Sequence, residues 1–371
     1  MSTFEGAALR RTALYDEHVA LGGRMVPFGG FEMPVQYAGI LKEHDAVRNR
    51  AGIFDLSHMA QYELRGEGVA AWADSLTVNH VGTMKPFQAR YNIFTNPRGG
   101  AHDDVLFYRL PDRWLLVVNA GNATKMWPYL QDAAAGHDDV RLESHHGSRA
   151  LIAVQGPRAV EIVTPLCDLD AAALPYYFCA EGHVDGAPAV IARTGYTGED
   201  GFELFVEGAD APRLWRTLLE RGAAFGLEPA GLGARDVLRL EAGMPLYGFE
   251  LTEDISPLAA GQAWAVKLAK PDFVGKAALE AQKAADDYDR IVGLALDGRV
   301  PARGGYAVFS GGARVGEIKS ASIAPAYGNK NVATALVKRD AAAVGTPLDV
   351  EIRGTLHGAR VVALPFYKRG T

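Results

Sequence analysis

Three positions carry side chains whose types and spacing could do chemistry on a small molecule. Asp104 is the second of two adjacent acids in an alternating apolar segment. Glu203 follows the turn-rich run Gly-Tyr-Thr-Gly-Glu-Asp-Gly at 195–201, and Arg235 lies in the segment Gly-Ala-Arg-Asp-Val-Leu-Arg-Leu-Glu-Ala-Gly at 233–243. A fixed carboxylate can accept N–H donors or stabilise a transient cation. These three residues are therefore the leading candidates for a site.

Asp104 lies on a predicted strand, where alternate residues share a face. By this parity Asp104 belongs with Leu106 and Tyr108, so it is expected to face an apolar environment. A carboxylate there is costly unless a cation or hydrogen-bond donors meet it, which is typical of a reactive site. The alternative is that Asp103 and Asp104 simply cap a strand end beside the turn at 99–100.

Glu203 leaves its turn on a strand in which Phe202, Leu204 and Val206 form the apolar set. The pattern predicts a β-hairpin over 187–207 with a carboxylate at its mouth. Two interpretations remain open at this point. Glu203 belongs either to a solvated strand face or to a binding site.

Arg235 falls in the first turn of a helix predicted over 234–242, where the helix dipole disfavours a cation by about 0.3 to 1 kcal/mol. Asp236 offsets part of that cost. A cation at this unfavourable position indicates a functional role for Arg235. An ion pair between Arg235 and a neighbouring acid explains the position equally well.

The bulk composition indicates a folded, soluble enzyme of more than one domain. A chain of 371 residues exceeds the usual ~100 to 200 residues per domain, so two or three packed units are expected. Hydrophobic residues make up 48% and charged residues 22%, which leaves no reason to expect disorder. The formal charge of -6 argues against general nucleic-acid binding.

The cysteines and the N-terminal segment indicate the compartment. Cys167 and Cys179 lack CxxC spacing, so neither a disulfide framework nor a zinc knuckle is expected. Met-Ser-Thr-Phe-Glu-Gly at the start lacks a basic and an apolar region, and no apolar run reaches the ~20 residues of a membrane helix. We expect a cytoplasmic protein that is neither exported nor membrane-bound.

The elements that must position the three candidates follow from periodicity. Helices are expected near 38–50, 69–76, 122–135 (interrupted by Pro128), 210–225 and 234–242, and an antiparallel meander over 89–119. After Arg290 the chain reads only as short strands with turn glycines, near 290–297, 305–309, 313–323, 332–338, 348–353 and 358–364. These strands predict a small closed or sandwiched β unit. No tandem repeat is evident.

Several other motifs are incomplete. Gly275-Lys276 lacks the remaining P-loop residues, and Gly231-Leu-Gly233 lacks the third glycine of a dinucleotide fingerprint. His58, His145 and His146 have no partners at metal spacing, so they are interpreted as structural.

The hairpin run at 195–203, the Asp103-Asp104 pair and the segment at 233–243 together resemble the aminomethyltransferase family, the T-protein of the glycine cleavage system. The resemblance extends to Arg-Thr-Ala-Leu-Tyr-Asp-Glu-His near the start and to Phe-Asp-Leu-Ser-His-Met at 54–59. It implies an α+β fold of three domains. Two mixed α and antiparallel-β units (1–52 with 140–285, and 53–139) form a folate-binding region over 1–285, and 286–371 forms a jelly-roll-like β-barrel.

The resemblance also implies the activity. It predicts a transferase that moves an aminomethyl carbon from the lipoyl arm of the carrier H-protein to tetrahydrofolate, releasing ammonia and leaving methylene-tetrahydrofolate. Tetrahydrofolate is then a co-substrate, the lipoylated H-protein is the partner, and no metal is expected. The alternatives are a folate-dependent demethylase of a small donor, of the dimethylsulfoniopropionate or methylamine type, and a non-catalytic folate-binding relative.

Residue roles follow from the same resemblance. Asp104 is the expected catalytic acid, and Glu203 is the expected clamp for the N–H and amino group of the pterin ring, with Tyr196 nearby. Arg235 is expected to contact folate. The weaker candidates are Tyr91 as a wall of the folate slot, Asn119 as a pterin hydrogen-bond partner, and Tyr367 with Arg369 near the glutamyl end.

Overall fold

The computed structural model describes residues 8–298 and 300–370, so the hexapeptide Met1 to Gly6 lies outside the described residues. The chain forms two compact units. The first takes residues up to Ala73, 81–91 and 105–236, and the second takes 74–80, 92–104 and the chain from Val237 onward. Within the described ranges no helix has both the length and the apolar character needed to cross a membrane.

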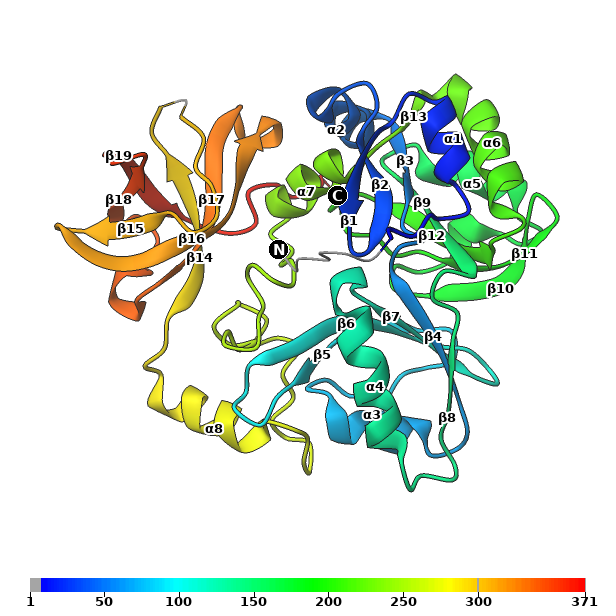
Figure 1. Ribbon diagram of the computed structural model, residues 1–371, viewed down its shortest axis with the longest axis horizontal. Coiled ribbons are helices and arrows are strands. Elements are labelled where there is room, and N and C mark those ends of the chain that lie inside the picture. The colour runs from blue at the N-terminus through cyan, green and yellow to red at the C-terminus, as the bar shows by residue number, and fades with distance from the viewer. Residues whose placement is uncertain (1–7, 299, 371) are drawn as a thin grey trace. The chain divides into compact units, whose positions relative to one another are not determined.

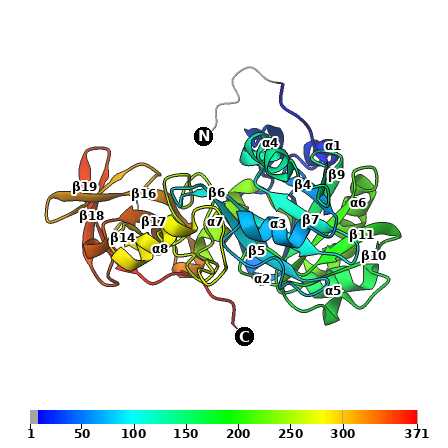
Figure 2. The same cartoon turned by 90° about the horizontal axis from the view of Figure 1, so that it is seen from below.

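The first unit is built on a six-stranded sheet whose helices α5 and α6 bury one face. The core joins the apolar strand residues Ile53, Ile152 and Leu204 to Trp215 and Leu218 of α6. Figure 2 shows the edge strand β10 of this sheet beside its neighbour β11. In order across the sheet, the strands are β10 (Cys179–Val184), β11 (Ala187–Ala192), β12 (Gly201–Glu207), β9 (Arg149–Gln155), β3 (Ala51–Asp55) and β13 (Leu227–Pro229).

A second sheet has five strands and carries Asp104. Tyr62 of the sheet packs against Trp127 of α4 at 4.8 Å between ring centroids, and Trp72 of α3 donates from Nε1 to the carbonyl oxygen of Ala133 in α4 at 3.0 Å. The strand order is β5 (Ala89–Thr95), β6 (Ala101–Arg109), β7 (Trp114–Val118), β4 (Ala60–Arg65) and β8 (Arg141–Ser144).

The two sheets share one connectivity. One segment runs β4-α3-β5-β6-β7-α4-β8 and another runs β9-α5-β10-β11-β12-α6-β13, with matching sheet orders β5-β6-β7-β4 and β10-β11-β12-β9. Phe87 and Tyr177, which precede β5 and β10, even share a φ of 63° that bulky residues rarely adopt. The structure therefore reveals a repeated arrangement that sequence analysis did not find.

The C-terminal part of the second unit is a closed antiparallel barrel, drawn in yellow to red in Figure 1. Its interior is apolar and includes Leu294, Val308, Ile318, Ala335 and Val350. The barrel order is β14 (Arg290–Leu296), β17 (Lys330–Val337), β16 (Ala313–Ala324), β15 (Ala307–Ser310), β18 (Pro347–Ile352) and β19 (Thr355–Val362). The strand-only sequence after Arg290 is thereby explained, since closure pairs every edge.

The remaining elements of the described chain are helices, a two-stranded hairpin and short turns. The α-helices are α1 (Tyr15–Ala20), α2 (Ile40–Asn49), α3 (Val69–Leu76), α4 (Ala123–Ala134), α5 (Ala159–Val163), α6 (Ala211–Gly222), α7 (Leu232–Glu241) and α8 (Lys276–Ala285). Strands β1 (Arg24–Phe28) and β2 (Phe31–Gln36) form a hairpin. Short 3-10 turns occupy Ala120–Asn122, Thr164–Leu166, Ala171–Ala173, Ala223–Phe225, Pro325–Tyr327 and Arg339–Ala341.

Most predicted elements are confirmed, including the meander, the 187–207 hairpin and the barrel strands. One expectation is wrong. Helix α4 continues through Pro128 without interruption. Pro128 is the sixth residue of α4, so only one backbone hydrogen bond of the helix is lost there, and the buried residues Met126 and Leu130 on either side hold the helix in place.

A buried polar cluster connects the segment at 11–18 with the segment at 54–59, which explains the polar residues in both. Asp55 accepts hydrogen bonds from Thr12 Oγ1 at 2.7 Å and from the backbone N–H of Ser57 at 2.8 Å, and its Oδ2 lies 2.9 Å from His18 Nε2. On the other side of the imidazole, Tyr37 Oη lies 2.9 Å from His18 Nδ1. Burial raises the pKa of Tyr37, so the phenol keeps its proton at neutral pH while its oxygen contacts His18. The cluster joins α1 and β3 to the residue that directly follows β2.

Asp55→Asn is expected to lower the free energy of unfolding by about 2 to 4 kcal/mol at pH 7, because an amide cannot accept every hydrogen bond that the carboxylate accepts. Burial by itself would raise the pKa of Asp55, but the hydrogen bond and charge of His18 and the bonds from Ser57 hold it below its usual range. A lowered folded-state pKa contributes stability above the unfolded value of about 4, and this stability is lost as the pH falls further.

The check is urea denaturation of parent and variant from pH 7 to pH 3. The difference between them should shrink below about pH 4. Asp254→Asn, at a side chain that is 88% exposed, is the matched control and should change little. A constant difference across the whole range would contradict the assignment to Asp55 ionisation.

Candidate functional site

Glu203 lies on β12 and is buried, with 7% of its surface exposed. It faces Ala192 of β11 across the hairpin. Oε2 accepts hydrogen bonds from Thr194 Oγ1 and, at 3.1 Å, from Tyr108 Oη. The interpretation of a solvated strand face is therefore wrong, because β6 residues of the first unit cover it: the Tyr108 ring also packs edge-on against Phe205 at 5.2 Å.

The charge of Glu203 is only partly compensated. Burial raises the pKa of Glu203, while the hydrogen bonds from Thr194 and Tyr108 and the positive charge of Arg235 lower it in part. A carboxylate has about four lone-pair positions, and the two protein hydrogen bonds both end on Oε2. Among the described residues nothing bonds to Oε1, so this oxygen has the acceptor capacity to meet a ligand N–H group.

Arg235 of α7 lies near this carboxylate and stacks on Tyr196. Its guanidinium carbon is 4.8 Å from the centre of the Tyr196 ring, a cation–π geometry. The neighbouring His58 is completely buried, and burial followed by the charge of Arg235 lowers its pKa to about 3, so the imidazole is neutral. The structure therefore brings together three predicted site residues, Glu203, Arg235 and Tyr196.

The loop at 193–200, which carries Thr194 and Tyr196, is held rigidly. Arg193 donates from Nε and Nη2 to both carboxylate oxygens of Asp200, at 3.0 and 2.6 Å. The buried Gln155 donates to the carbonyl oxygen of Thr194 at 3.0 Å. A Cβ on Gly195 would lie 2.0 Å from Gln155 Oε1, so only glycine lets the loop approach this closely. Asp200 is therefore engaged in fixing this loop through its ion pair with Arg193.

Asp104 lies on β6 and is half-buried, at the point where the chain passes from the second unit into the first. Asp103, on the opposite face of the strand, is completely buried. The face of β6 that carries Asp103 is therefore more enclosed than the face that carries Asp104. His102 shares the face of Asp104, and its Nδ1 lies 3.3 Å from Glu253 Oε1. Asp104 and Tyr108 leave β6 on the same side because they are four residues apart.

The weaker candidates are placed as follows. Tyr91, on β5, and Asn119, directly after β7, are half-buried members of the first unit. Tyr367 belongs to the second unit, where its backbone N–H donates to the carbonyl oxygen of Glu241 at 2.8 Å. Arg369 is exposed in the same unit.

Sequence reasoning missed three residues around Glu203: Tyr108, Thr194 and Tyr177. Burial raises the pKa of Tyr177, and the charges of Tyr176 and Glu203 add to this. Strand parity offered a signal for Tyr108, which shares the face of Asp104, but nothing in the sequence indicated that β6 and β12 meet. Such a contact is decided by tertiary packing.

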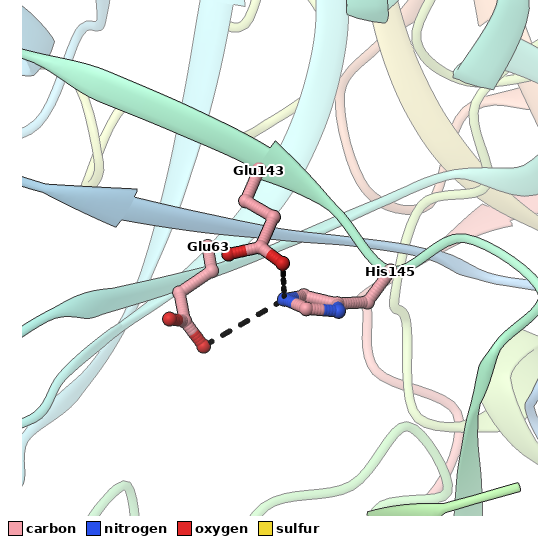
Figure 3. A group of neighbouring side chains, drawn as sticks. All are labelled: Glu63, Glu143 and His145. Atoms are coloured by element: carbon pink, nitrogen blue, oxygen red, sulfur yellow. Dashed lines mark ion pairs between the residues drawn. The ribbon is translucent and has the colours of Figure 1, made fainter.

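His145 has acidic neighbours that sequence spacing did not reveal. Its Nε2 lies 3.8 Å from Glu63 Oε2 and 3.6 Å from Glu143 Oε1, as Figure 3 shows. The donor atoms of the three residues lie within 4.8 Å of one another, a spacing that a metal ion could bridge. Three guanidinium groups already contact the Glu63 carboxylate, from Arg65, Arg113 and Arg149. Their positive charge opposes a cation, so the group is better described as an ion-pair network.

Two family models match the chain. The model described as the GCVT N-terminal domain matches residues 14–270, and the one described as the glycine cleavage T-protein C-terminal barrel domain matches residues 290–368. The second match coincides with the barrel strands.

Individual relatives match over nearly the full length. An aminomethyltransferase from Moorella thermoacetica is 47% identical over 364 residues, covering 98% of this chain and 99% of its own. One from Bacillus subtilis is 44% identical, with 97% of this chain and 100% of the relative covered. Among solved structures, the glycine cleavage system aminomethyltransferase T from Bartonella henselae superimposes with a TM-score of 0.91 at 34% identity, covering 97% of this chain and 99% of its own.

Proposed function

Since this chain belongs to the glycine cleavage T-protein family of aminomethyltransferases, we propose that Glu203 and Arg235 bind the pterin part of tetrahydrofolate and that Asp104 acts on the transferred carbon. The chain is an enzyme that transfers an aminomethyl group within the glycine cleavage system, with tetrahydrofolate as the acceptor. The observation that carries the assignment of residues is the buried Glu203 carboxylate, which has acceptor capacity left on Oε1 and a guanidinium nearby.

Pterin recognition would use this acceptor capacity. A reduced pterin presents an N–H and an amino group side by side, and a carboxylate can accept both. Because Thr194 and Tyr108 donate to Oε2, the ligand donors would converge mainly on Oε1. Each charge-assisted bond is worth about 1.5 to 3 kcal/mol. Arg235 would lie along the ligand, with its plane held by Tyr196.

The reaction requires charge stabilisation at one carbon. The aminomethyl carbon loses its bonds to the lipoyl sulfur and to the amino nitrogen, and it gains bonds to two folate nitrogens. Of the two protons released from those nitrogens, one leaves with ammonia and the other ends on the lipoyl thiol. While the carbon is changing partners it has iminium character, so positive charge develops on it. A fixed carboxylate at Asp104 would stabilise that charge and orient the folate nitrogen, with proton transfer as a further contribution.

The donor in this proposal is a lipoylated carrier protein of the glycine cleavage system, whose arm reaches the folate. The cytoplasmic location, the lack of a metal requirement, and the division into a folate-binding region 1–285 and a barrel domain 286–371 are parts of the same proposal. Tyr91, Asn119, Tyr367 and Arg369 are its secondary folate contacts. The family match gives no support to a small-molecule demethylase or to a non-catalytic relative.

The decisive assay follows ammonia release from an aminomethyl-loaded lipoyl carrier. We expect release that depends on tetrahydrofolate and is stoichiometric with methylene-tetrahydrofolate. Dimethylsulfoniopropionate and methylamines supplied in place of the carrier should give no folate-linked product. Turnover with such a free donor, or no turnover with the carrier, would reject the proposal.

A further inference from the structure

Helix α2 contacts the two segments that carry Arg235 and Tyr196. It spans Ile40–Asn49 and packs against β3 so closely that a Cβ on Gly52 would lie 2.4 Å from Val47 Cγ2. Two charged side chains of α2 are enclosed: Glu43 is completely buried, and the side chain of Arg48 is 6% exposed. Buried charges of this kind are costly unless fully paired, so their partners indicate what the helix does.

Glu43 fixes the start of α7, the helix that carries Arg235. Its side chain is completely buried, and Oε2 accepts the backbone N–H of Gly231 at 2.9 Å. Gly231 directly precedes α7, and its carbonyl oxygen accepts the backbone N–H of Arg235 at 3.1 Å. Glu43 Oε1 accepts two further N–H groups, from Tyr37 at 2.6 Å and Gly39 at 3.0 Å.

The start of α7 has little freedom to move. A Cβ on Gly231 would lie 2.5 Å from the Val35 carbonyl carbon, so the backbones of the two segments touch. A carboxylate at the N-terminal end of α7 interacts favourably with the helix dipole. The cation in the first turn of α7 interacts with it unfavourably. Glu43 thus places a carboxylate at the N-terminal end of the helix that carries Arg235, from a position nearly two hundred residues earlier in the chain.

Arg48 fixes the loop that carries Tyr196. Its Nη1 donates to the carbonyl oxygen of Thr197 at 2.7 Å and to Glu199 Oε1 at 2.8 Å. The side chains of Arg48 and Glu199 are 6% and 2% exposed. A buried, charge-assisted contact of this kind restricts the loop more than an exposed pair would.

We propose that α2 is a positioning element for the ligand site: Glu43 sets the place of Arg235 through Gly231, and Arg48 sets the place of Tyr196 through Thr197. Neither residue is catalytic. Together they hold the spacing of the Arg235–Tyr196 stack, which is one wall of the proposed pterin site. The inference rests on the proposed function, since it concerns the affinity of that site for tetrahydrofolate.

The test is a double-mutant cycle on tetrahydrofolate affinity, measured by calorimetry with Glu43→Gln, Arg235→Ala and the double variant. Glu43→Gln keeps the shape but turns an acceptor oxygen into an amide that faces the Gly231 N–H. We expect about a fivefold to twentyfold loss of affinity in the parent background and less than about a twofold further loss beside Arg235→Ala. In turnover, KM for tetrahydrofolate should rise more than kcat falls.

Asp45→Asn is the matched control, because it removes the same charge from the same helix at a side chain that is 58% exposed. Its affinity should equal that of the parent. A second cycle pairs Arg48→Lys with Tyr196→Leu and should show the same lack of additivity.

The outcomes separate the two proposals. If Arg235→Ala does not weaken folate binding, both the site assignment and this inference fail. If Arg235→Ala weakens binding while Glu43→Gln leaves it unchanged, or adds its full effect to that of Arg235→Ala, only the positioning role fails. Should Glu43→Gln and Arg48→Lys both fail to fold, α2 serves stability alone and the inference is overturned.

Discussion

Asp104→Asn is expected to lower kcat by about 10²- to 10⁴-fold while the protein stays folded and still binds tetrahydrofolate. The substitution keeps the size and polarity of the side chain and removes only its negative charge. In the proposed reaction that charge is needed when the aminomethyl carbon becomes cationic, so the loss should appear in the transition state and not in ligand affinity. Single-turnover kinetics with a loaded carrier protein measure this effect.

Asp103→Asn is the natural control for that experiment. It makes the same chemical change one residue away, on the opposite and completely buried face of β6. We expect Asp103→Asn to reduce stability and to leave the kcat of the folded protein close to that of the parent. If Asp104→Asn turns over at the parent rate, or if the two variants lose activity equally, the assignment of Asp104 is wrong.

Glu203→Gln is expected to act in opposite directions on stability and on binding. The free energy of tetrahydrofolate binding should become weaker by a few kcal/mol at most. The amide keeps one acceptor oxygen, but it lacks the negative charge that strengthens hydrogen bonds to the pterin. Unfolding of the ligand-free protein should instead require about 1 to 2 kcal/mol more at pH 7, because a buried, partly compensated carboxylate is replaced by a neutral group.

The pH dependence of this second effect follows from the direction of the pKa shift. Burial raises the folded-state pKa of Glu203 above its unfolded value. A raised pKa means that the favourable contribution of the group is present below the unfolded value of about 4.3 and is lost as the pH rises through the folded value. The stability advantage of Glu203→Gln should therefore be largest at neutral pH and shrink as the parent carboxylate becomes protonated.

Thermal unfolding without ligand and calorimetric titration with tetrahydrofolate, both from pH 4.5 to 8, test these expectations. Glu207→Gln, on the same strand at a side chain that is 60% exposed, is the control and should change neither property much. A Glu203→Gln variant that is less stable and binds folate normally would show that Glu203 has a structural role only.

Much of the local structure could be predicted from the sequence. Alternation and turn residues gave the hairpin that carries Glu203, and helical spacing gave α2 and α3, because these elements depend on contacts between residues close in the chain. The strand-only composition after Arg290 likewise indicated the barrel. Asp104, Glu203 and Arg235 were singled out as charges in unusual places on single elements.

The surroundings of those charges were decided only by tertiary structure. The sequence left open whether Glu203 is solvated, and burial by Tyr108 and Thr194 answers it. An acidic neighbour for Arg235 was sought next to it in the sequence, whereas Glu43 comes from another helix and bonds to the backbone at the start of α7. Periodicity reports which face of an element is apolar, but not which face of another element will cover it. The identity of the charged residues is therefore local information, and their pKa values, partners and orientation are properties of the folded chain.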